Sequence, residues 1–202
     1  MLDLSALILQ CAINVAPSTM MAIIKTESQG NPLALGINKG YRLKSPPKTP
    51  EQAAQWAIYL EKNNYNFDVG LAQINIKNIH RYGYKASDAL DPCTNLKMAS
   101  DILAKNYHGA LSSSSSSHEA LQKAISAYNT GNYQSGFRNG YVQKVYANAN
   151  SKPINTSGNI PTIIPINTTK KVIANKNTTL ASNQRRSTMV YARQINSAAN
   201  FY

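Results

Sequence analysis

The most informative segment of this 202-residue chain is Ser18-Thr-Met-Met-Ala-Ile-Ile-Lys-Thr-Glu-Ser-Gln-Gly-Asn-Pro32. Its apolar side chains recur three and four residues apart, as one face of a helix requires, and Glu27 continues that face seven residues after Met20. Gly30 and Pro32 predict the end of the helix. A carboxyl group on an apolar face is poorly solvated, which raises its pKa, and a glutamate protonated near neutral pH can act as a general acid. Glu27 is therefore a candidate catalytic residue; the alternative is a glutamate that turns to solvent at a fraying helix end.

Three later segments combine amide and aromatic side chains, residue types that are typical of carbohydrate-binding sites. They are Asp68-Val-Gly-Leu-Ala-Gln-Ile-Asn75, Ala127-Tyr-Asn-Thr-Gly131 and Tyr141-Val-Gln-Lys-Val145. In the first, Gln73 and Asn75 interrupt an apolar run. In the second, Tyr128 lies on the apolar stripe of a helix and Asn129 at its end, while Tyr141 begins the last predicted helix. Planar rings pack on sugars and amides hydrogen-bond to hydroxyl and N-acetyl groups. Tyr128 also fits a purely structural role as a core aromatic.

Composition excludes several classes of protein. The chain is 43% hydrophobic, enough for the core of a domain of roughly 150 residues. It has no apolar run approaching the roughly 18 residues that cross a bilayer. Two cysteines and three scattered histidines without an HExxH motif predict no metal site.

The charge divides the chain in two. Residues 1–150 hold 14 basic and 9 acidic residues, whereas residues 151–202 hold 7 basic residues and no acidic one. From about residue 148 the sequence is rich in Asn, Thr and Ser and is interrupted by proline, a composition with too little apolar surface to offset the entropy of ordering. We therefore predict a folded domain over 1–149 and a disordered basic tail over 150–202.

Helical patterns dominate the predicted domain. Helices are expected over 4–14, from Pro17, from Pro50 to about Asn63 with Thr49 as N-cap, from Asp91-Pro92, after the six serines at 112–117, and from Tyr141. Strand-like sequence is confined to Val69–Ile76. The expected fold class is mostly α (α+β).

Four short motifs resemble, in order, those of the soluble lytic transglycosylases, lysozyme-like enzymes that cleave the glycan of peptidoglycan. They are Glu27-Ser28, Gly70-Leu-Ala-Gln-Ile, Ala127-Tyr-Asn and Tyr141. The resemblance runs from about Cys11 to Tyr146, and details such as Asn139-Gly-Tyr-Val-Gln-Lys-Val145 are similar to the branch that serves type IV secretion and conjugation. It implies a fold like that of goose-type lysozyme. One departure is Ala72, where family members usually carry methionine; a smaller pocket floor is expected there.

The resemblance also implies roles for individual residues. Glu27 would protonate the oxygen between N-acetylmuramic acid and N-acetylglucosamine, and as a carboxylate it would take the proton from the sugar's C6 hydroxyl. Attack by that hydroxyl closes a 1,6-anhydro ring without water. Tyr141 would orient Glu27. The substrate-binding residues would be Ser28, Gln73, Asn75, Tyr128 and Asn129. No metal or organic cofactor is implied.

The setting implied by the resemblance is the periplasm or cell envelope of a Gram-negative bacterium, although residues 1–15 contain no visible export signal. An oxidising compartment implies a disulfide between Cys11 and Cys93, the only two cysteines; the alternative is two buried thiols. The partners implied are peptidoglycan glycan strands and type IV secretion components. We expect a monomer.

Three other functions fit parts of the sequence. A hydrolytic lysozyme would need a second acid to hold water, and the one acid beside a motif, Asp68, is expected to hydrogen-bond nearby backbone instead. A catalytically idle secretion-assembly factor would not need Glu27 with its supporting motifs. Nucleic-acid binding is suggested by the net charge of +12, but the predicted domain contains no basic helix or aromatic–basic array. We therefore expect no nucleic-acid partner.

Overall fold

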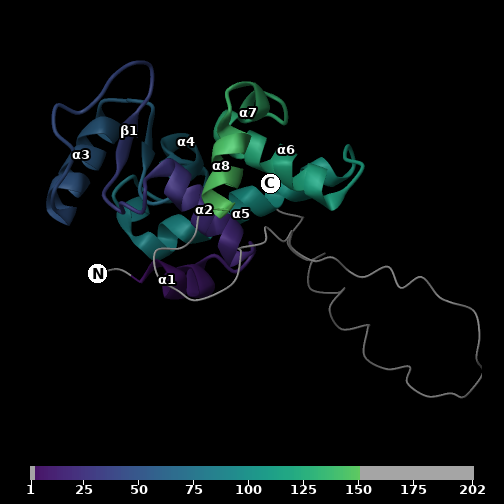
Figure 1. Ribbon diagram of the computed structural model, residues 1–202. Coiled ribbons are helices and arrows are strands. Elements are labelled where there is room, and N and C mark those ends of the chain that lie inside the picture. Colours follow the sequence, from purple (N-terminus) through teal and green to yellow (C-terminus); the bar gives the residue numbers. More distant parts are fainter. Residues whose placement is uncertain (1–2, 151–202) are drawn as a thin grey trace, which may run out of the picture. The chain divides into compact units, whose positions relative to one another are not determined.

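The computed structural model of the protein describes residues 3–150, and the fold there is mostly helical with one small sheet (Figure 1). The elements in chain order are α1 (Leu4–Cys11), α2 (Pro17–Glu27), β1 (Leu35–Ile37), α3 (Pro50–Lys62), β2 (Phe67–Val69), β3 (Ile74–Asn75), α4 (Ile76–Arg81), the 3-10 turn η1 (Asp88–Leu90), α5 (Pro92–Leu111), α6 (Ser117–Thr130), α7 (Ser135–Arg138) and α8 (Tyr141–Asn150). The predicted fold class is confirmed. The predicted disordered tail lies, apart from Asn150, outside the described residues.

The helices begin where local capping signals predicted. Thr49 Oγ1 accepts a hydrogen bond from the Gln52 N–H at 3.3 Å, and Pro50 occupies the first position of α3. Asp91 caps α5 in the same way. Ser116 caps α6, so this helix begins at Ser117, inside the serine run and not after it as predicted. The first helix is shorter than predicted, because it ends at Cys11 rather than Asn14.

The helices pack around one apolar core. The helix pairs in closest association are α5 with α6, α2 with α8, and α6 with α7, and α1 also packs on α5. Large side chains that are fully buried include Ile8, Ile23, Leu96, Leu103 and Ile125. Not every large apolar side chain joins the core: Ile58 is 53% exposed, because it lies on the outer face of α3.

A disulfide joins Cys11, the last residue of α1, to Cys93 in the first turn of α5. The Cα atoms are 5.3 Å apart, and the bond closes a loop with a sequence separation of 82 residues. The predicted pairing is confirmed. It fixes α1 to the helix that supports the sheet.

The sheet is antiparallel with strand order β1-β2-β3. Gly36 faces Asp68 across the first ladder, and Asp68 faces Asn75 across the second. The prediction of strand structure near Val69–Ile76 was right, because β2 ends and β3 lies within this segment. It missed β1, and it missed the short helix α4 that begins directly after β3.

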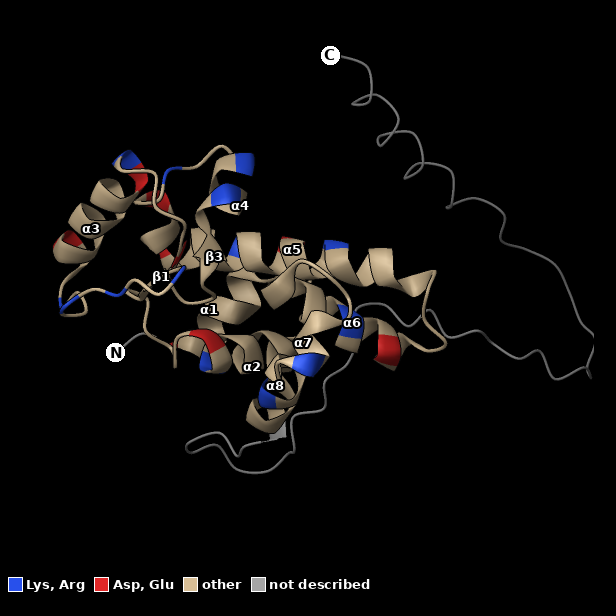
Figure 2. Ribbon diagram, turned by 90° about the horizontal axis from the view of Figure 1, so that it is seen from above, with Lys and Arg blue, Asp and Glu red and all other residues tan. Residues whose placement is uncertain are grey.

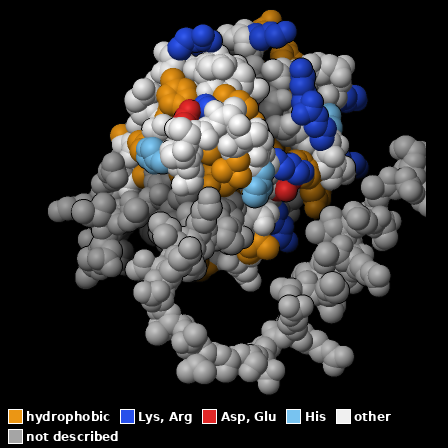
Figure 3. Space-filling model, turned by 90° about the vertical axis from the view of Figure 1, so that its right-hand side faces the viewer, with side chains coloured by type: hydrophobic (Ala, Val, Ile, Leu, Met, Phe, Trp, Pro, Cys, Tyr) orange, Lys and Arg blue, Asp and Glu red, His pale blue; other side chains and the backbone are white. Residues whose placement is uncertain are grey.

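In the part of the chain that the structure describes, no helix has both the length and the apolar character needed to cross a membrane. On the face drawn in Figure 3, basic side chains outnumber acidic ones and are separated by neutral ones.

Candidate active site

Glu27 and Tyr141 come together where the end of α2 meets the start of α8. The Tyr141 hydroxyl donates a hydrogen bond to Glu27 Oε1 across a sequence separation of 114 residues. Burial raises the pKa of the Tyr141 hydroxyl well above its usual value, so this group remains a donor. The predicted helical face is present: Met20, Ile23 and Ile24 are fully buried, and Glu27 follows them as a half-buried side chain.

The electrostatic environment of Glu27 favours its protonated form. Burial raises the pKa of this carboxyl from 4.5 to about 7; the hydrogen bond from Tyr141 opposes the rise, and the negative charge of Asp68 adds to it. A carboxyl group with a pKa near neutrality can hold a proton in the resting site and release it during a reaction. This is the property that a general acid needs.

Glu27 opens onto a pocket of about 810 Å³. Four of the predicted substrate-binding residues line the same pocket: Gln73, Asn75, Tyr128 and Asn129. Ser28 and Tyr141 do not line it. The structure therefore gathers Glu27 and four predicted residues at one cavity and places the other two behind it.

The loop between β2 and β3 forms part of the pocket, and three side chains fasten it. Ser28 Oγ donates to the Leu71 carbonyl at 2.6 Å, and the Tyr128 hydroxyl donates to the Ala72 carbonyl at 2.8 Å. Gln73 Nε2 donates to the Gly70 carbonyl at 2.9 Å. The ends of α2 and α6 are thus tied to the loop. Ser28 and the Tyr128 hydroxyl have structural partners in addition to any role toward a ligand.

Asn95 on α5 supports this loop from below and was not singled out in the sequence. Its side chain is fully buried, accepts from the Ala72 N–H at 2.9 Å, and donates to the Val69 and Ala89 carbonyls at 2.8 Å each. Gly70 has a φ of +80°, and a Cβ there would lie 2.4 Å from Asn95 Nδ2. Glycine is therefore required at this position. The sequence offered one sign of this role: Asn95 is a polar residue next to the apolar Leu96 in a predicted helix.

Ala72 is itself fully buried and does not line the pocket. Its backbone is held on both sides, by Asn95 at the N–H and by Tyr128 at the carbonyl. The expected effect of this alanine on the pocket floor thus remains a prediction.

Asp68 also lines the pocket, as a second carboxyl group facing the same cavity as Glu27. Asp68 Oδ1 accepts from Asn75 Nδ2 at 2.7 Å, and Asp68 Oδ2 accepts from Asn38 Nδ2 at 3.1 Å. Burial raises the pKa of this carboxyl, and the two amides oppose the rise. Its partners are thus side-chain amides, not the backbone groups expected from the sequence. The Asn38 contact depends on the pairing of β1 with β2, which was not predicted.

The far side of the pocket is built by residues that the sequence did not indicate. Lys77, Asn78 and Arg81 come from α4, and Ile102 and Asn106 come from α5. Figure 2 shows two basic segments on α4, close to the sheet. The three residues of α4 were missed because this helix was not predicted. Among the described residues, no group of three or more His, Cys, Asp or Glu side chains is placed to hold a metal ion.

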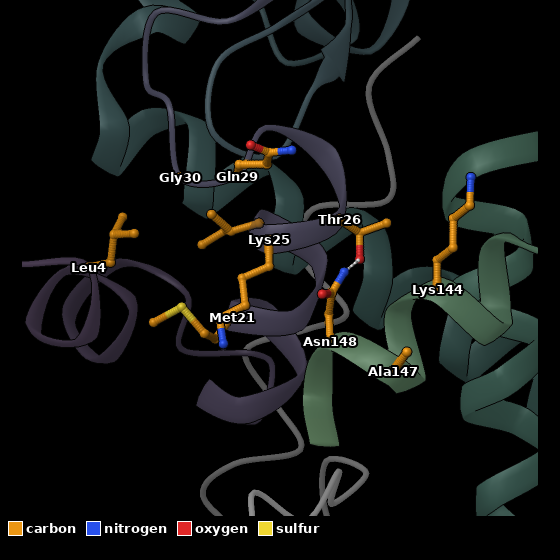
Figure 4. A pocket seen from close by; sticks show the side chains of 10 residues that line it. Leu4, Met21, Lys25, Thr26, Gln29, Gly30, Lys144, Ala147 and Asn148 are labelled. Atoms are coloured by element: carbon orange, nitrogen blue, oxygen red, sulfur yellow. Dashed lines mark hydrogen bonds between the residues drawn. The ribbon is translucent and has the colours of Figure 1, made fainter. Parts of the chain in front are cut away.

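A second pocket, of about 780 Å³, lies between α2 and α8 and shares no lining residue with the first (Figure 4). Met21 and Lys25 line it from α2, and Lys144 lines it from α8. At its edge Asn148 Nδ2 donates to Thr26 Oγ1 at 2.9 Å. This bond joins α2 to α8 beside the residue pair Glu27–Tyr141, so it stabilises the helix contact on which the site depends.

One family model and several relatives match this chain. The model of the transglycosylase SLT domain family matches residues 7–151. The type IV secretion system protein virB1 of Brucella abortus is 42% identical over 153 residues, covering 72% of this chain and 64% of that protein. Protein virB1 of Agrobacterium fabrum is 41% identical over 137 residues, covering 67% of this chain and 55% of that protein. The chain thus matches less than two thirds of the length of these relatives. No solved structure matches it at a significant level.

Because the family model covers well over half of the chain and spans every element from Glu27 to Tyr141, the protein belongs to the transglycosylase SLT domain family.

Proposed function

We propose that this protein is a peptidoglycan lytic transglycosylase. It cleaves the β-1,4 bond between N-acetylmuramic acid and N-acetylglucosamine without water and leaves 1,6-anhydro ends. The observation that carries the proposal is Glu27, whose pKa is raised to about 7 by burial and which faces a pocket lined with amide and aromatic side chains. Membership of the transglycosylase family supports the same chemistry.

The reaction needs one residue that first donates a proton and then accepts one. Protonated Glu27 gives its proton to the glycosidic oxygen as the bond to the anomeric carbon breaks, and the N-acetyl carbonyl of the muramyl residue assists at that carbon. The resulting Glu27 carboxylate removes the proton from the C6 hydroxyl, whose oxygen bonds to the anomeric carbon. The proton returns to Glu27, so the site is ready for another cycle. A pKa near 7 suits both halves of this exchange.

The pocket residues supply position. Tyr141 holds Glu27 in one orientation through its hydrogen bond. Gln73, Asn75 and Asn129 present amide groups to the cavity, and Tyr128 contributes a ring to its wall. Holding the C6 hydroxyl near the anomeric carbon makes the second step intramolecular, an advantage that a water molecule does not have.

The relatives named virB1 support a place for this activity. Because one of them is named as a protein of the type IV secretion system, we propose that this chain opens the cell wall for such a system. The location would be the periplasm or cell envelope of a Gram-negative bacterium, and the partners would be glycan strands and secretion components. The disulfide between Cys11 and Cys93 suits an oxidising compartment.

Mass analysis of the products from purified peptidoglycan tests the proposal. We expect 1,6-anhydro muropeptides from the wild-type protein and a loss of at least about a hundredfold in rate for Glu27→Gln, because glutamine keeps the shape but has no acidic proton. Glu51→Gln, which changes an exposed carboxylate on α3, is the control and should be fully active. Wild-type cleavage by a folded Glu27→Gln protein would disprove the role of this residue.

A hydrolytic lysozyme is the alternative function, and Asp68 favours it, because a second carboxyl group in the same pocket could hold a water molecule. The same product analysis separates the two reactions. Hydrolysis gives reducing muramic ends that are heavier than the anhydro products by one water. If these predominate and Asp68→Asn abolishes them, the protein is a muramidase.

A further inference from the structure

Two basic side chains project from α4 into the pocket that contains Glu27. Lys77 and Arg81 are four residues apart, so they lie on the same side of this short helix, and both are exposed residues that line the pocket. They share its lining with the two carboxyl groups, Glu27 and Asp68. The cleft therefore carries both acidic groups and a pair of cations.

The cations are not neutralised within the part of the protein that the structure describes. The ion pairs found in residues 3–150 are His80–Glu61, Lys105–Asp101 and Lys123–Glu119, so neither Lys77 nor Arg81 has a carboxylate partner there. Arg81 Nη1 donates to the Asn78 side-chain oxygen at 3.2 Å, which uses one of its donors and helps to fix the guanidinium.

The acids of the pocket already have partners of their own. Glu27 accepts from Tyr141, and Asp68 accepts from two asparagine amides. Two cations that line a cleft without carboxylate partners are suited to a ligand that carries carboxylates.

We propose that Lys77 and Arg81 form a subsite for the carboxylates of the peptide stem on the muramyl sugar. The inference rests on the proposed function, and it defines the substrate further, as glycan strands that bear acidic peptides. The sugar backbone is bound by neutral amides at one part of the pocket, while the stem projects from the muramyl ring and meets α4. Because both cations are exposed, each contact contributes modestly and weakens with salt.

A binding experiment with chemically matched strands tests this subsite. Soluble strands with acetylated amines are prepared with the stem carboxylates either free or converted to neutral methylamides. Their affinities are measured with protein carrying Glu27→Gln, so that no strand is cut. The measurements are then repeated with protein that carries Lys77→Gln and Arg81→Gln in addition to Glu27→Gln. The matched control is Lys97→Gln/Lys144→Gln, which removes the same charge from exposed residues outside the Glu27 pocket.

We expect the Lys77→Gln/Arg81→Gln pair to weaken binding of the free-carboxylate strand about three- to tenfold and to leave binding of the methylamide strand unchanged. The control pair should affect neither strand selectively, and salt should remove the preference for the charged strand. Equal effects on both strands, or no effect on either, would overturn the subsite.

Cleavage by the wild-type protein is a separate measurement. Selective binding without cleavage would refute the enzyme and not the subsite.

Discussion

Glu27 has two neighbours that change its pKa in opposite directions. The hydrogen bond from Tyr141 stabilises the carboxylate and lowers the pKa, whereas the negative charge of Asp68 raises it; burial is larger than either effect. The high-pH limb of the kcat/KM profile reports the loss of the acidic proton from the free enzyme. The midpoint of this limb should therefore lie near pH 7. Substitutions at the two neighbours should move this limb in opposite directions.

Tyr141→Phe removes the hydrogen bond while keeping the ring. We expect the pKa of Glu27 to rise and the high-pH limb to move to higher pH, together with a lower maximal rate because the carboxyl group is less well oriented. Asp68→Asn removes a charge, so the pKa of Glu27 should fall and the limb should move to lower pH. Profiles that shift in the same direction for both variants would contradict this account of the site.

The same pKa predicts that the site destabilises the fold at high pH. Glu27 binds its proton more tightly in the folded protein than in the unfolded chain, so folding is penalised as the pH rises from 4.5 to about 7. Glu27→Gln removes the penalty. We expect its free energy of unfolding to exceed that of the wild-type protein by about 1–3 kcal/mol at pH 8, a range reduced from about 1.4 kcal/mol per pKa unit because the side chain is partly solvated. Denaturant unfolding at pH 4 should show almost no difference.

At the scale of elements, the loop between β2 and β3 depends on α5 for its shape. Asn95, which is fully buried, holds the Val69 carbonyl at the end of β2, the Ala72 N–H in the loop and the Ala89 carbonyl in the turn η1. Asn95 on α5 therefore sets the conformation of the loop, although it does not line the pocket. The loop in turn sets the position of Gln73 in the pocket.

We expect Asn95→Ala to lower the free energy of unfolding by at least about 2 kcal/mol, because it leaves buried backbone groups without partners. Activity should fall even at temperatures where the variant is folded, since the loop also carries the partner groups of Ser28 and Tyr128. Asn63→Ala, at an exposed asparagine that bonds only the end of α3, is the matched control. Equal stability of the two variants in denaturant unfolding would show that the loop does not depend on Asn95.

At the scale of the whole molecule, every residue assigned to the proposed site lies within the described residues, 3–150. Its last contributor, Tyr141, begins α8, and the family match ends at residue 151. The core also closes with α8, through Val142, Val145 and Ala149. The contacts described for Glu27 and for the residues that line its pocket are all made within residues 3–150.

A protein truncated after Asn150 should keep its disulfide, its thermal midpoint within a few degrees, and its rate on soluble glycan strands within about twofold. It should bind less well to intact cell wall, because it loses seven basic residues and no acidic one. Full-length protein assayed in parallel is the reference, and higher salt should reduce the difference in wall binding. If truncation unfolds the domain or removes most of the activity, residues beyond 150 belong to the enzyme.

Features that depend on short stretches of chain were predictable from the sequence. The starts of α2, α3 and α5 follow from proline and capping residues, and the stripe that leads to Glu27 follows from helical spacing. These are interactions between residues a few positions apart, so the local sequence contains all the partners. The predicted pairing of the two cysteines was also right, since no other pairing exists within the chain.

The surroundings of Glu27 were decided by the tertiary structure. The side chain of Asp68 meets that of Asn38 across 30 residues, and Tyr141 meets Glu27 across 114. No periodicity in the sequence encodes such contacts, because they arise only when α8 packs on α2 and β1 pairs with β2. The sequence determined that Glu27 continues an apolar face. Burial and the nearby Asp68, which exist only in the packed molecule, raised its pKa to about 7, since desolvation and charge act through space and not along the chain.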